Sequence, residues 1–289
     1  MFAATIGFFD GVHRGHRCLI EQMKTLAAKN GLETLIVTMD RHPREVILQD
    51  CTPLLLTTTE ERLCLLGDTG VNDIKVLHFD RQMSSLSARD FMLQILKPLN
   101  VSMLLMGYDH HFGHGDAQPD DYLRWGAECG IQVVHAHELE GEHISSTAIR
   151  ALLAQGHVQE ANKLLGHPYL LSGTVVSGQR LGRSIGFPTA NISIPSEKLL
   201  PKKGVYAVRS DLGLGMMDIG TRPTTKTGGT LSVEVHLFDF SGDLYGKSFR
   251  VEILGFIREE RTFDSLGSLR GQLEQDRITV LQQYVSDTK

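Results

Sequence analysis

Apolar residues in the first part of the chain form short continuous runs, and amphipathic stretches separate these runs. Continuous runs are typical of strands buried on both faces, whereas apolar positions three or four apart are typical of helices that cover a sheet. Strands are predicted over residues 5–9, 34–39, 73–78 and 101–106, and a helix over residues 88–96. Another helix follows the first strand and ends near Gly31, with an apolar stripe of Leu19, Ile20, Met23, Leu26 and Ala27. The alternation predicts a Rossmann-like α/β domain with a parallel sheet.

The pattern changes near residue 171, where closely spaced strands joined by Gly-, Pro- and Asp-containing turns replace the alternation. These strands are predicted over residues 172–177, 190–194, 205–210, 232–240 and 248–256. Such a series is typical of a small antiparallel β-barrel. A helix over residues 265–284 follows, and its stripe of Leu266, Leu269, Leu273 and Leu281 is expected to pack against the barrel. We therefore expect two domains, residues 1–165 and residues 166–289.

Composition and charge narrow the range of partners. The chain has 289 residues, of which 41% are hydrophobic and 22% charged, and its formal net charge is −5. Because no run of Lys and Arg is present, we expect small ligands rather than nucleic acid or a membrane surface. The scattered cysteines predict neither a disulfide framework nor a zinc ribbon. Without a basic N-terminal segment or an apolar run of about 18 residues, the chain is expected to be cytoplasmic.

The segment from residue 7 to residue 16 joins the first strand to the following helix. It contains Gly7, Phe9 and Gly11, and then His13 and His16 three residues apart. A strand, a glycine turn and a helix N-terminus together form an anion site, and imidazoles on one helix face can donate hydrogen bonds to phosphate oxygens. The segment predicts binding of a nucleoside triphosphate, with a capped helix carrying two surface histidines as the alternative.

A second helix start lies at residues 144–150 and also carries phosphate-binding chemistry. Ser145, Ser146 and Thr147 precede an apolar stripe that ends before Gly156, and Arg150 lies one turn into the helix on the hydroxyl side. Free N–H groups, hydroxyls and a guanidinium can together hold a triphosphate. The alternative is an ordinary helix cap with a solvated arginine. Combined with the histidine segment, these residues predict a complete phosphate site.

The second half opens with a glycine-rich loop that is also suited to phosphate. Gly178, Gly182 and Gly186 let the backbone approach an anion closely, and Arg183 adds positive charge. Thr189 and Asn191 are two residues apart, so on a strand they offer two oxygens on one side to Mg²⁺. A simple hairpin is the alternative for the loop.

A later strand, over residues 232–237, carries a glutamate outside the apolar core. Alternation along residues 232–237 puts Val233, Val235 and Leu237 on the apolar face and Glu234 on the other face. The Mg²⁺ motif at Thr189 and Asn191 favours a functional part for this carboxylate. Its alternative is a solvated strand glutamate.

These motifs resemble the bifunctional riboflavin kinase/FAD synthetases of bacteria over essentially the whole chain, and the Pro-Thr-Ala-Asn sequence at residues 188–191 is a signature of riboflavin kinases. The resemblance implies phosphorylation of riboflavin to FMN in the second domain, with Glu234 as the base. It implies adenylylation of FMN to FAD in the first domain, with His13 and His16 stabilising charge at the α-phosphate. ATP would be the co-substrate of both steps, Mg²⁺ the cofactor, and riboflavin, FMN and FAD the other ligands.

The resemblance also implies a set of flavin-side residues, and several depart from the family pattern. Residues 39–43 read Met-Asp-Arg-His-Pro where the family has Phe-x-Pro-His-Pro, so Pro43 carries over. In the loop over residues 107–113, His110 replaces a Phe, while Phe112 is kept and Asp109 is a polar contact to substrate or ATP. Arg258 matches a segment near the flavin and nucleotide. Asp218 replaces a usual Asn.

Other interpretations remain open at this point. His110, His111 and His114 invite a metal site, but no fixed-spacing partner completes a zinc pattern, so none is expected. An adenylyltransferase for another phosphorylated metabolite would keep the first phosphate site but has no use for Glu234. A flavin-binding regulatory protein would explain the altered flavin loops. The oligomeric state is not indicated.

Overall fold

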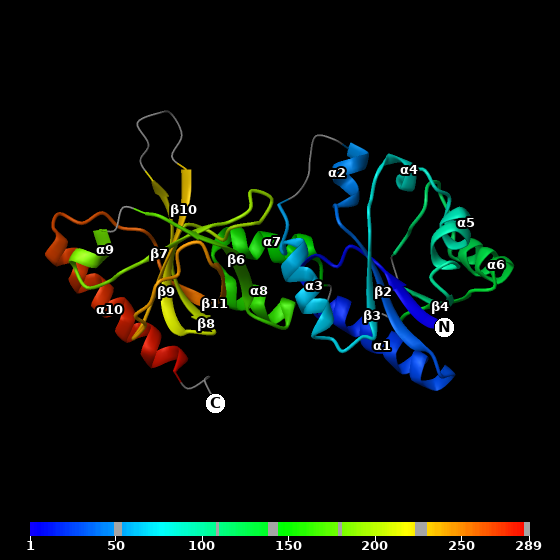
Figure 1. Cartoon of the computed structure of the whole chain (residues 1–289), viewed down its shortest axis with the longest axis horizontal. Coiled ribbons are helices and arrows are strands. Elements are labelled where there is room, and N and C mark those ends of the chain that lie inside the picture. The colour runs from blue at the N-terminus through cyan, green and yellow to red at the C-terminus, as the bar shows by residue number, and fades with distance from the viewer. Residues whose placement is uncertain (49–53, 108–109, 138–143, 179–180, 223–229, 286–289) are drawn as a thin grey trace. The chain divides into compact units, whose positions relative to one another are not determined.

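The structure is a computed structural model, and it describes residues 1–48, 54–107, 110–137, 144–178, 181–222 and 230–285 (Figure 1). The chain divides into two compact units. One consists of Met1–Leu54 and Thr59–Ser145, and the other of Leu55–Thr58 and Ser146–Lys289. By contact, the helices that follow Ser145 therefore belong with the second unit. The boundary between residues 165 and 166 concerns the division of activities and stays a prediction.

The first unit is built on a five-stranded parallel sheet, as predicted for a Rossmann-like domain. Its strands are β1 (Phe2–Ile6), β2 (Glu33–Met39), β3 (Asp73–Leu77), β4 (Val101–Met106) and β5 (Gln132–His135). The spatial order is β3-β2-β1-β4-β5, so the chain builds outward from β1 first to one side and then to the other. In such sheets, ligands bind beyond the carboxyl ends of the strands where the order reverses. The loops after β1 and β4 flank this position.

Helices and a short turn connect these strands. They are the 3₁₀ turn η1 (Asp10–Val12), α1 (Arg14–Asn30), α2 (Pro43–Leu48), α3 (Thr59–Gly67), α4 (Arg81–Ser84), α5 (Ala88–Phe91) with its π-helical continuation η2 (Met92–Leu96), and α6 (Pro119–Cys129). The predicted stripe of α1 is confirmed at Ile20, Met23 and Ala27, which are fully covered. The helix ends at Gly31 with a left-handed φ of 63°.

The first strand differs from its predicted position. It spans Phe2–Ile6 rather than residues 5–9, because the backbone leaves the extended conformation after Gly7 and Phe9 is left-handed with φ 55°. The apolar run continues past the strand since Phe9 and Val12 are buried within the loop itself. The prediction from hydrophobicity alone therefore put the C-terminal end of this strand three residues too late.

The second unit contains a closed six-stranded barrel with antiparallel pairings, which confirms the predicted fold class. Its strands are β6 (Tyr169–Val176), β7 (Ala190–Ser193), β8 (Gly204–Ser210), β9 (Gly213–Arg222), β10 (Thr230–Leu237) and β11 (Ser248–Arg258). The sequence analysis did not predict β9, whose glycines lower its strand propensity. One of them is required by packing, because a Cβ atom at Gly215 would collide with the carbonyl of His236 on β10.

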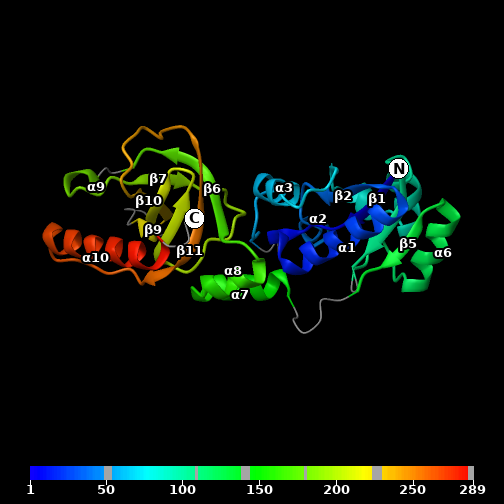
Figure 2. The same cartoon turned by 90° about the horizontal axis from the view of Figure 1, so that it is seen from below.

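In the described part of the second unit, the barrel is accompanied by the helices α7 (Ser146–Gln155), α8 (Val158–Leu165), α9 (Leu181–Ser184) and α10 (Leu266–Tyr284). The C-terminal helix α10, red in Figure 2, packs against β9 and β11. Val280 is fully buried in that contact, and Leu273 and Leu281 are partly buried there. The predicted stripe is wrong at its first position, because Leu266 is 58% exposed at the helix N-terminus.

A buried ion pair fixes α10 to the barrel. Arg258 at the end of β11 donates from Nε to both carboxylate oxygens of Asp276 at 3.0 Å, and from Nη2 to Oδ2 at 2.8 Å. Asp276 is 2% exposed, so this bidentate pair lies almost entirely out of water. Removing one partner of such a pair leaves the other buried and uncompensated, which makes the pair a constraint on where α10 lies.

Candidate active sites

The loop after β1 has an unusual backbone. Phe9, Gly11 and Val12 have positive φ angles of 55°, 80° and 40°. This conformation is unfavourable for a β-branched residue such as Val12, and it persists only where the surrounding packing imposes it. Here the loop reverses direction within a few residues and brings His13 to the N-cap of α1.

His13 and His16 form a stacked pair at the start of α1. The backbone N–H of His16 donates to His13 Nδ1 at 3.3 Å, and the ring centroids lie 3.6 Å apart with an interplanar angle of 16°. Because Nδ1 of His13 is an acceptor, the proton of the neutral ring is on Nε2, where it can be donated to a phosphate oxygen. A Cβ atom at Gly15 would lie 3.2 Å from the His13 ring, so the glycine between the histidines makes room for it.

His16 is held in its neutral form in the ligand-free protein. Burial, followed by the proximity of His13 and His110, lowers the pKa of His16 well below its usual value. Among the described residues no group accepts or donates a hydrogen bond at its buried Nδ1. An anion placed beside this ring would favour its protonation. The influence of His110 also shows that the loops after β1 and β4 converge at the reversal of strand order.

The second phosphate motif begins beside the histidines. The carbonyl oxygen of Ile144 lies 4.0 Å from where a Cβ atom of Gly15 would be, so the chain just before Ser145 passes the N-terminus of α1. Ser145 ends the first unit, whereas Ser146, Thr147 and Arg150 form the first turns of α7 in the second. Their predicted binding of phosphate stays a prediction.

The predicted flavin-side residues occupy different environments. Pro43 is the first residue of α2, next to His42, whose ring meets Phe8 edge-on at 4.8 Å. Phe112 is buried in the core, where the Tyr122 hydroxyl bonds to both its N–H and its carbonyl. Asp109 lies outside the described residues. Phe112 therefore supports the loop through the core, and its contact with flavin stays a prediction.

The barrel brings the second set of predicted residues into one row. Glu234 on β10 is in register with Asn191 on β7 and with Asp218 on β9. Residues in register on neighbouring strands point to the same face, so the three side chains lie side by side. Thr189 joins them, because its hydroxyl donates to Glu234 Oε2 at 3.0 Å.

His236 is a residue of this site whose part was not predicted. It lies on the same side of β10 as Glu234, and its Nδ1 bonds to the carbonyl oxygen of Pro188 at 2.8 Å. Its ring packs against Phe187 at 5.0 Å, and burial lowers its pKa, so the neutral ring is favoured. The bond to Pro188 holds the residue immediately before Thr189. Alternation along residues 232–237 also puts His236 on the same face as Glu234, but alternation does not predict the carbonyl group that His236 contacts.

Close backbone approach explains two glycines of the loop before β7. A Cβ atom at Gly178 would collide with the Asn191 side-chain amide, and one at Gly182 would collide with the Phe187 carbonyl. Arg183 is exposed on α9, and Gly186 has φ 87°. The loop is therefore packed directly on the row that contains Asn191.

Arg258 does not extend toward this row as an independent cation, because its guanidinium is occupied by Asp276. Its positive charge still acts on the neighbouring carboxylates. Burial, Glu260 and Glu234 raise the pKa of Asp218 to about 6, and Arg258 opposes this rise. The row thus concentrates negative charge, which attracts a cation.

Comparison with known proteins gives the family of both units. A riboflavin kinase family model matches residues 165–284, and an FAD synthetase family model matches residues 1–148. A bifunctional riboflavin kinase/FMN adenylyltransferase of Escherichia coli is 40% identical over 287 residues, covering 95% of this chain and 90% of its own length. This chain belongs to that bifunctional family. Its substrates are riboflavin, FMN and ATP, and FAD is the product of the second reaction.

Other relatives agree over the same length. The bifunctional riboflavin kinase/FMN adenylyltransferase of Listeria monocytogenes is 37% identical, covering 94% of this chain and 88% of its own. A crystal structure described as a macrolide-efflux protein from Streptococcus pneumoniae has a TM-score of 0.84 and 32% identity, covering 96% of this chain and 93% of that one. Within the described ranges of this chain, no helix has the length and apolarity needed to span a membrane.

The raised pKa of Asp218 predicts a pH-dependent stability effect. The pKa of Asp218 in the folded protein is about 6 against a usual 3.8, so the folded protein holds this proton more tightly than the unfolded chain does. The free energy of unfolding that this group contributes is therefore fully present below pH 3.8 and is lost as the pH rises through 6. We expect Asp218→Asn to increase the free energy of unfolding of the ligand-free protein by about 1–2 kcal/mol near pH 8, with the gain disappearing toward about pH 4.

Denaturant unfolding at both pH values measures this effect. The control is Asp264→Asn, at an exposed aspartate of the same unit. It should change the free energy of unfolding by a similarly small amount at both pH values. A gain for Asp218→Asn that did not depend on pH would contradict the electrostatic explanation.

Proposed function

We propose that residues 166–289 transfer the γ-phosphate of ATP to riboflavin and that residues 1–165 transfer AMP from ATP to the FMN formed. The observation that carries this proposal is the row of Asn191, Glu234 and Thr189 in the barrel, on which the glycine-rich loop is packed directly. The stacked pair of His13 and His16 supports the second reaction. The cytoplasmic location expected from the sequence is part of the same proposal.

In the kinase reaction, Glu234 acts as the general base. It accepts the proton of the riboflavin 5′-hydroxyl as the hydroxyl oxygen attacks the γ-phosphorus, and ADP leaves. The hydrogen bond from Thr189 orients the carboxylate. His236 supports Thr189 through the carbonyl of Pro188. Backbone groups around Gly178, Gly182 and Gly186, together with Arg183, are proposed to bind the ATP phosphates.

Thr189 and Asn191 are the proposed ligands of Mg²⁺. The side-chain oxygen of Asn191 is buried and, within the described part of the chain, has no hydrogen-bond partner, which suits an oxygen that receives a cation. The Thr189 hydroxyl donates its proton to Glu234, so its lone pairs can face a metal. Mg²⁺ held there would offset the charge of the ATP phosphates in the kinase reaction, and Mg²⁺ bound to ATP would do so in the adenylyltransferase reaction.

In the adenylyltransferase reaction, the protein positions two anions for in-line attack. An oxygen of the FMN phosphate forms a bond to the α-phosphorus of ATP, and the bond from that phosphorus to the bridging oxygen of pyrophosphate breaks. His13 Nε2–H and His16 donate to the oxygens on which charge increases. Ser145, Ser146, Thr147 and Arg150 are proposed to hold the remaining phosphates, with Gly7, Phe9 and Gly11 shaping the loop.

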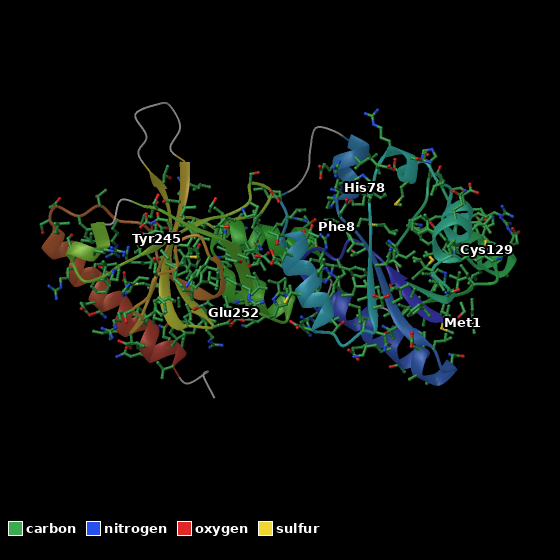
Figure 3. All side chains as sticks on the ribbon, in the orientation of Figure 1. Met1, Phe8, His78, Cys129, Tyr245 and Glu252 are labelled. Carbon is green, nitrogen blue, oxygen red and sulfur yellow. The ribbon has the colours of Figure 1, made fainter. Side chains whose placement is uncertain are left out.

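Glu234→Gln tests the kinase half. Because the amide keeps the shape of the side chain but cannot accept the proton, riboflavin phosphorylation should fall by roughly 10² to 10⁴. Adenylylation of supplied FMN should persist, as measured by chromatography of the flavins. Glu252→Gln, at a strand glutamate on β11 labelled in Figure 3, is the matched control and should keep both activities. Unchanged phosphorylation by the Glu234 variant would remove the base assignment.

His16→Ala tests the adenylyltransferase half. Loss of a transition-state donor should reduce FAD formation from FMN by on the order of 10² to 10³, with riboflavin phosphorylation nearly unchanged. The matched control is His137→Ala, because the ring of His137 is exposed and its bonds to Gln22 involve only the backbone. If the His16 variant lost both activities while remaining folded, the assignment of separate sites would be wrong.

Removal of metal tests the Mg²⁺ assignment. Protein dialysed against a chelator should form neither FMN nor FAD, and Mg²⁺ should restore both products, because the triphosphate charge is otherwise not offset. Elemental analysis of the dialysed protein should find no zinc, since the histidine loop does not offer a tetrahedral ligand set. Stoichiometric zinc that resists dialysis would contradict this.

A further inference from the structure

Arg62 on α3 is a buried cation that neither reaction, as described above, uses. Its side chain is 0% exposed. Nη2 donates to the carbonyl oxygen of Met39 at 2.6 Å, but Nε and Nη1 have no hydrogen-bond partner in the part of the chain that the structure describes. Burial lowers its pKa to about 10, against the opposing effect of Asp10 and Asp40, so the guanidinium remains protonated at neutral pH. Unpaired donors on a buried charge are costly, which calls for a compensating role.

The position of Arg62 indicates where that role lies. Its guanidinium carbon lies 4.1 Å from the centre of the Phe8 ring, and Phe8 is in the loop after β1 (Figure 3). Met39 is the last residue of β2. Arg62 is therefore at the carboxyl ends of β1 and β2, where ligands approach a parallel sheet. The other side of β1 leads to β4 and to the loop that contains His110.

The surroundings of Arg62 connect it to the segment that resembles the family's flavin-side loop. Phe8 also contacts His42, which precedes Pro43 in the segment that resembles the family's flavin-side loop. Phe8 and His42 are only half-buried. Phe8 therefore contacts both Arg62 and His42, and displacement of its ring would uncover the guanidinium to a ligand in this loop.

The chemistry of the unpaired groups selects an anion. A guanidinium offers N–H donors in a planar fork that matches the oxygens of a phosphate, and its charge does not depend on pH in the physiological range. The isoalloxazine ring of flavin is neutral and does not require a permanent cation. FMN, in contrast, carries a phosphate monoester, and this group must approach the negatively charged triphosphate of ATP.

We propose that Arg62 binds the 5′-phosphate of FMN in the adenylyltransferase site and holds it for attack on ATP. This inference rests on the proposed function of the first unit. The Arg62 side chain forms and breaks no covalent bond. It positions the attacking phosphate and reduces the repulsion between the two anionic substrates, while the histidine pair interacts with the triphosphate.

The test compares Arg62→Lys and Arg62→Met with wild type in the full chain. Lysine keeps the charge but loses the fork, so we expect the KM for FMN to rise about tenfold, and further with methionine. The KM for ATP should stay within about twofold in the lysine variant, and riboflavin phosphorylation should not change. Arg89→Lys, at an exposed arginine of the same unit paired with Glu128, is the matched control and should leave both KM values unchanged.

A flavin without phosphate distinguishes a phosphate contact from a ring contact. 5′-Deoxyriboflavin has no hydroxyl to phosphorylate, and its inhibition constant against FMN should be the same in wild type and Arg62→Lys. A parallel rise in this constant would instead place Arg62 against the ring and overturn the proposal. A rise in the KM for ATP with an unchanged KM for FMN would assign Arg62 to the triphosphate and equally overturn it.

Thermal unfolding separates binding from a purely structural role. If Arg62 only supported the loop, Arg62→Met would lower Tm and leave the KM for FMN unchanged, and this result would falsify the proposal. If wild-type protein made no FAD from FMN, the proposed function would fail, and the inference with it. If wild-type protein made FAD from FMN normally and neither Arg62 variant changed a kinetic constant, the inference about Arg62 would be rejected. The proposed function would then stand.

Discussion

Leaving a buried hydrogen-bonding group without a partner costs about 1–3 kcal/mol, and His16, Asn191 and Arg62 each carry such a group when partners are sought among the described residues. These atoms have almost no surface exposed to bulk solvent. Asn191 lies in a row across neighbouring strands, His16 lies in the first turn of α1, and Arg62 on α3 reaches the end of β2. The sites are thus arranged before substrate arrives, and the packing around them must supply the stability that they remove.

The two units hold their sites rigid by different means. In the first, a loop with three left-handed residues turns the chain so that His13 caps α1 and accepts the N–H of His16. In the second, closure of the barrel fixes the register of β7, β10 and β9, and that register alone brings Asn191, Glu234 and Asp218 together. A shift of one residue would turn Glu234 into the core.

The sequence could predict what depends on local periodicity. Alternation along β10 identified Glu234 and the buried Val233 and Val235, and the parallel sheet followed from continuous apolar runs. It could not predict interactions that depend on distant partners. The pairing of Arg258 with Asp276 required a helix to pack on β11. The roles of His236 and Arg62 depend on carbonyl groups at Pro188 and Met39, which have no signature in the sequence. The glycine-rich β9 was missed because its strand conformation is imposed by its neighbours.

The charge around each proposed site suits the reaction that we propose for it. In the barrel, Asp218, Glu234 and Glu260 gather negative charge, which favours removal of a proton from a neutral hydroxyl and requires a cation to bring in ATP. In the α/β unit, both substrates are anions, and the donors that we propose to contact them are His13, His16 and Arg62. Asp10 and Asp40 lie close enough to Arg62 to raise its pKa. A lowered pKa keeps His16 uncharged until an anion is present. One pocket could not satisfy both requirements, because carboxylates that activate riboflavin would repel the phosphate of FMN from ATP. This conflict gives a physical reason for two separate sites in a single chain.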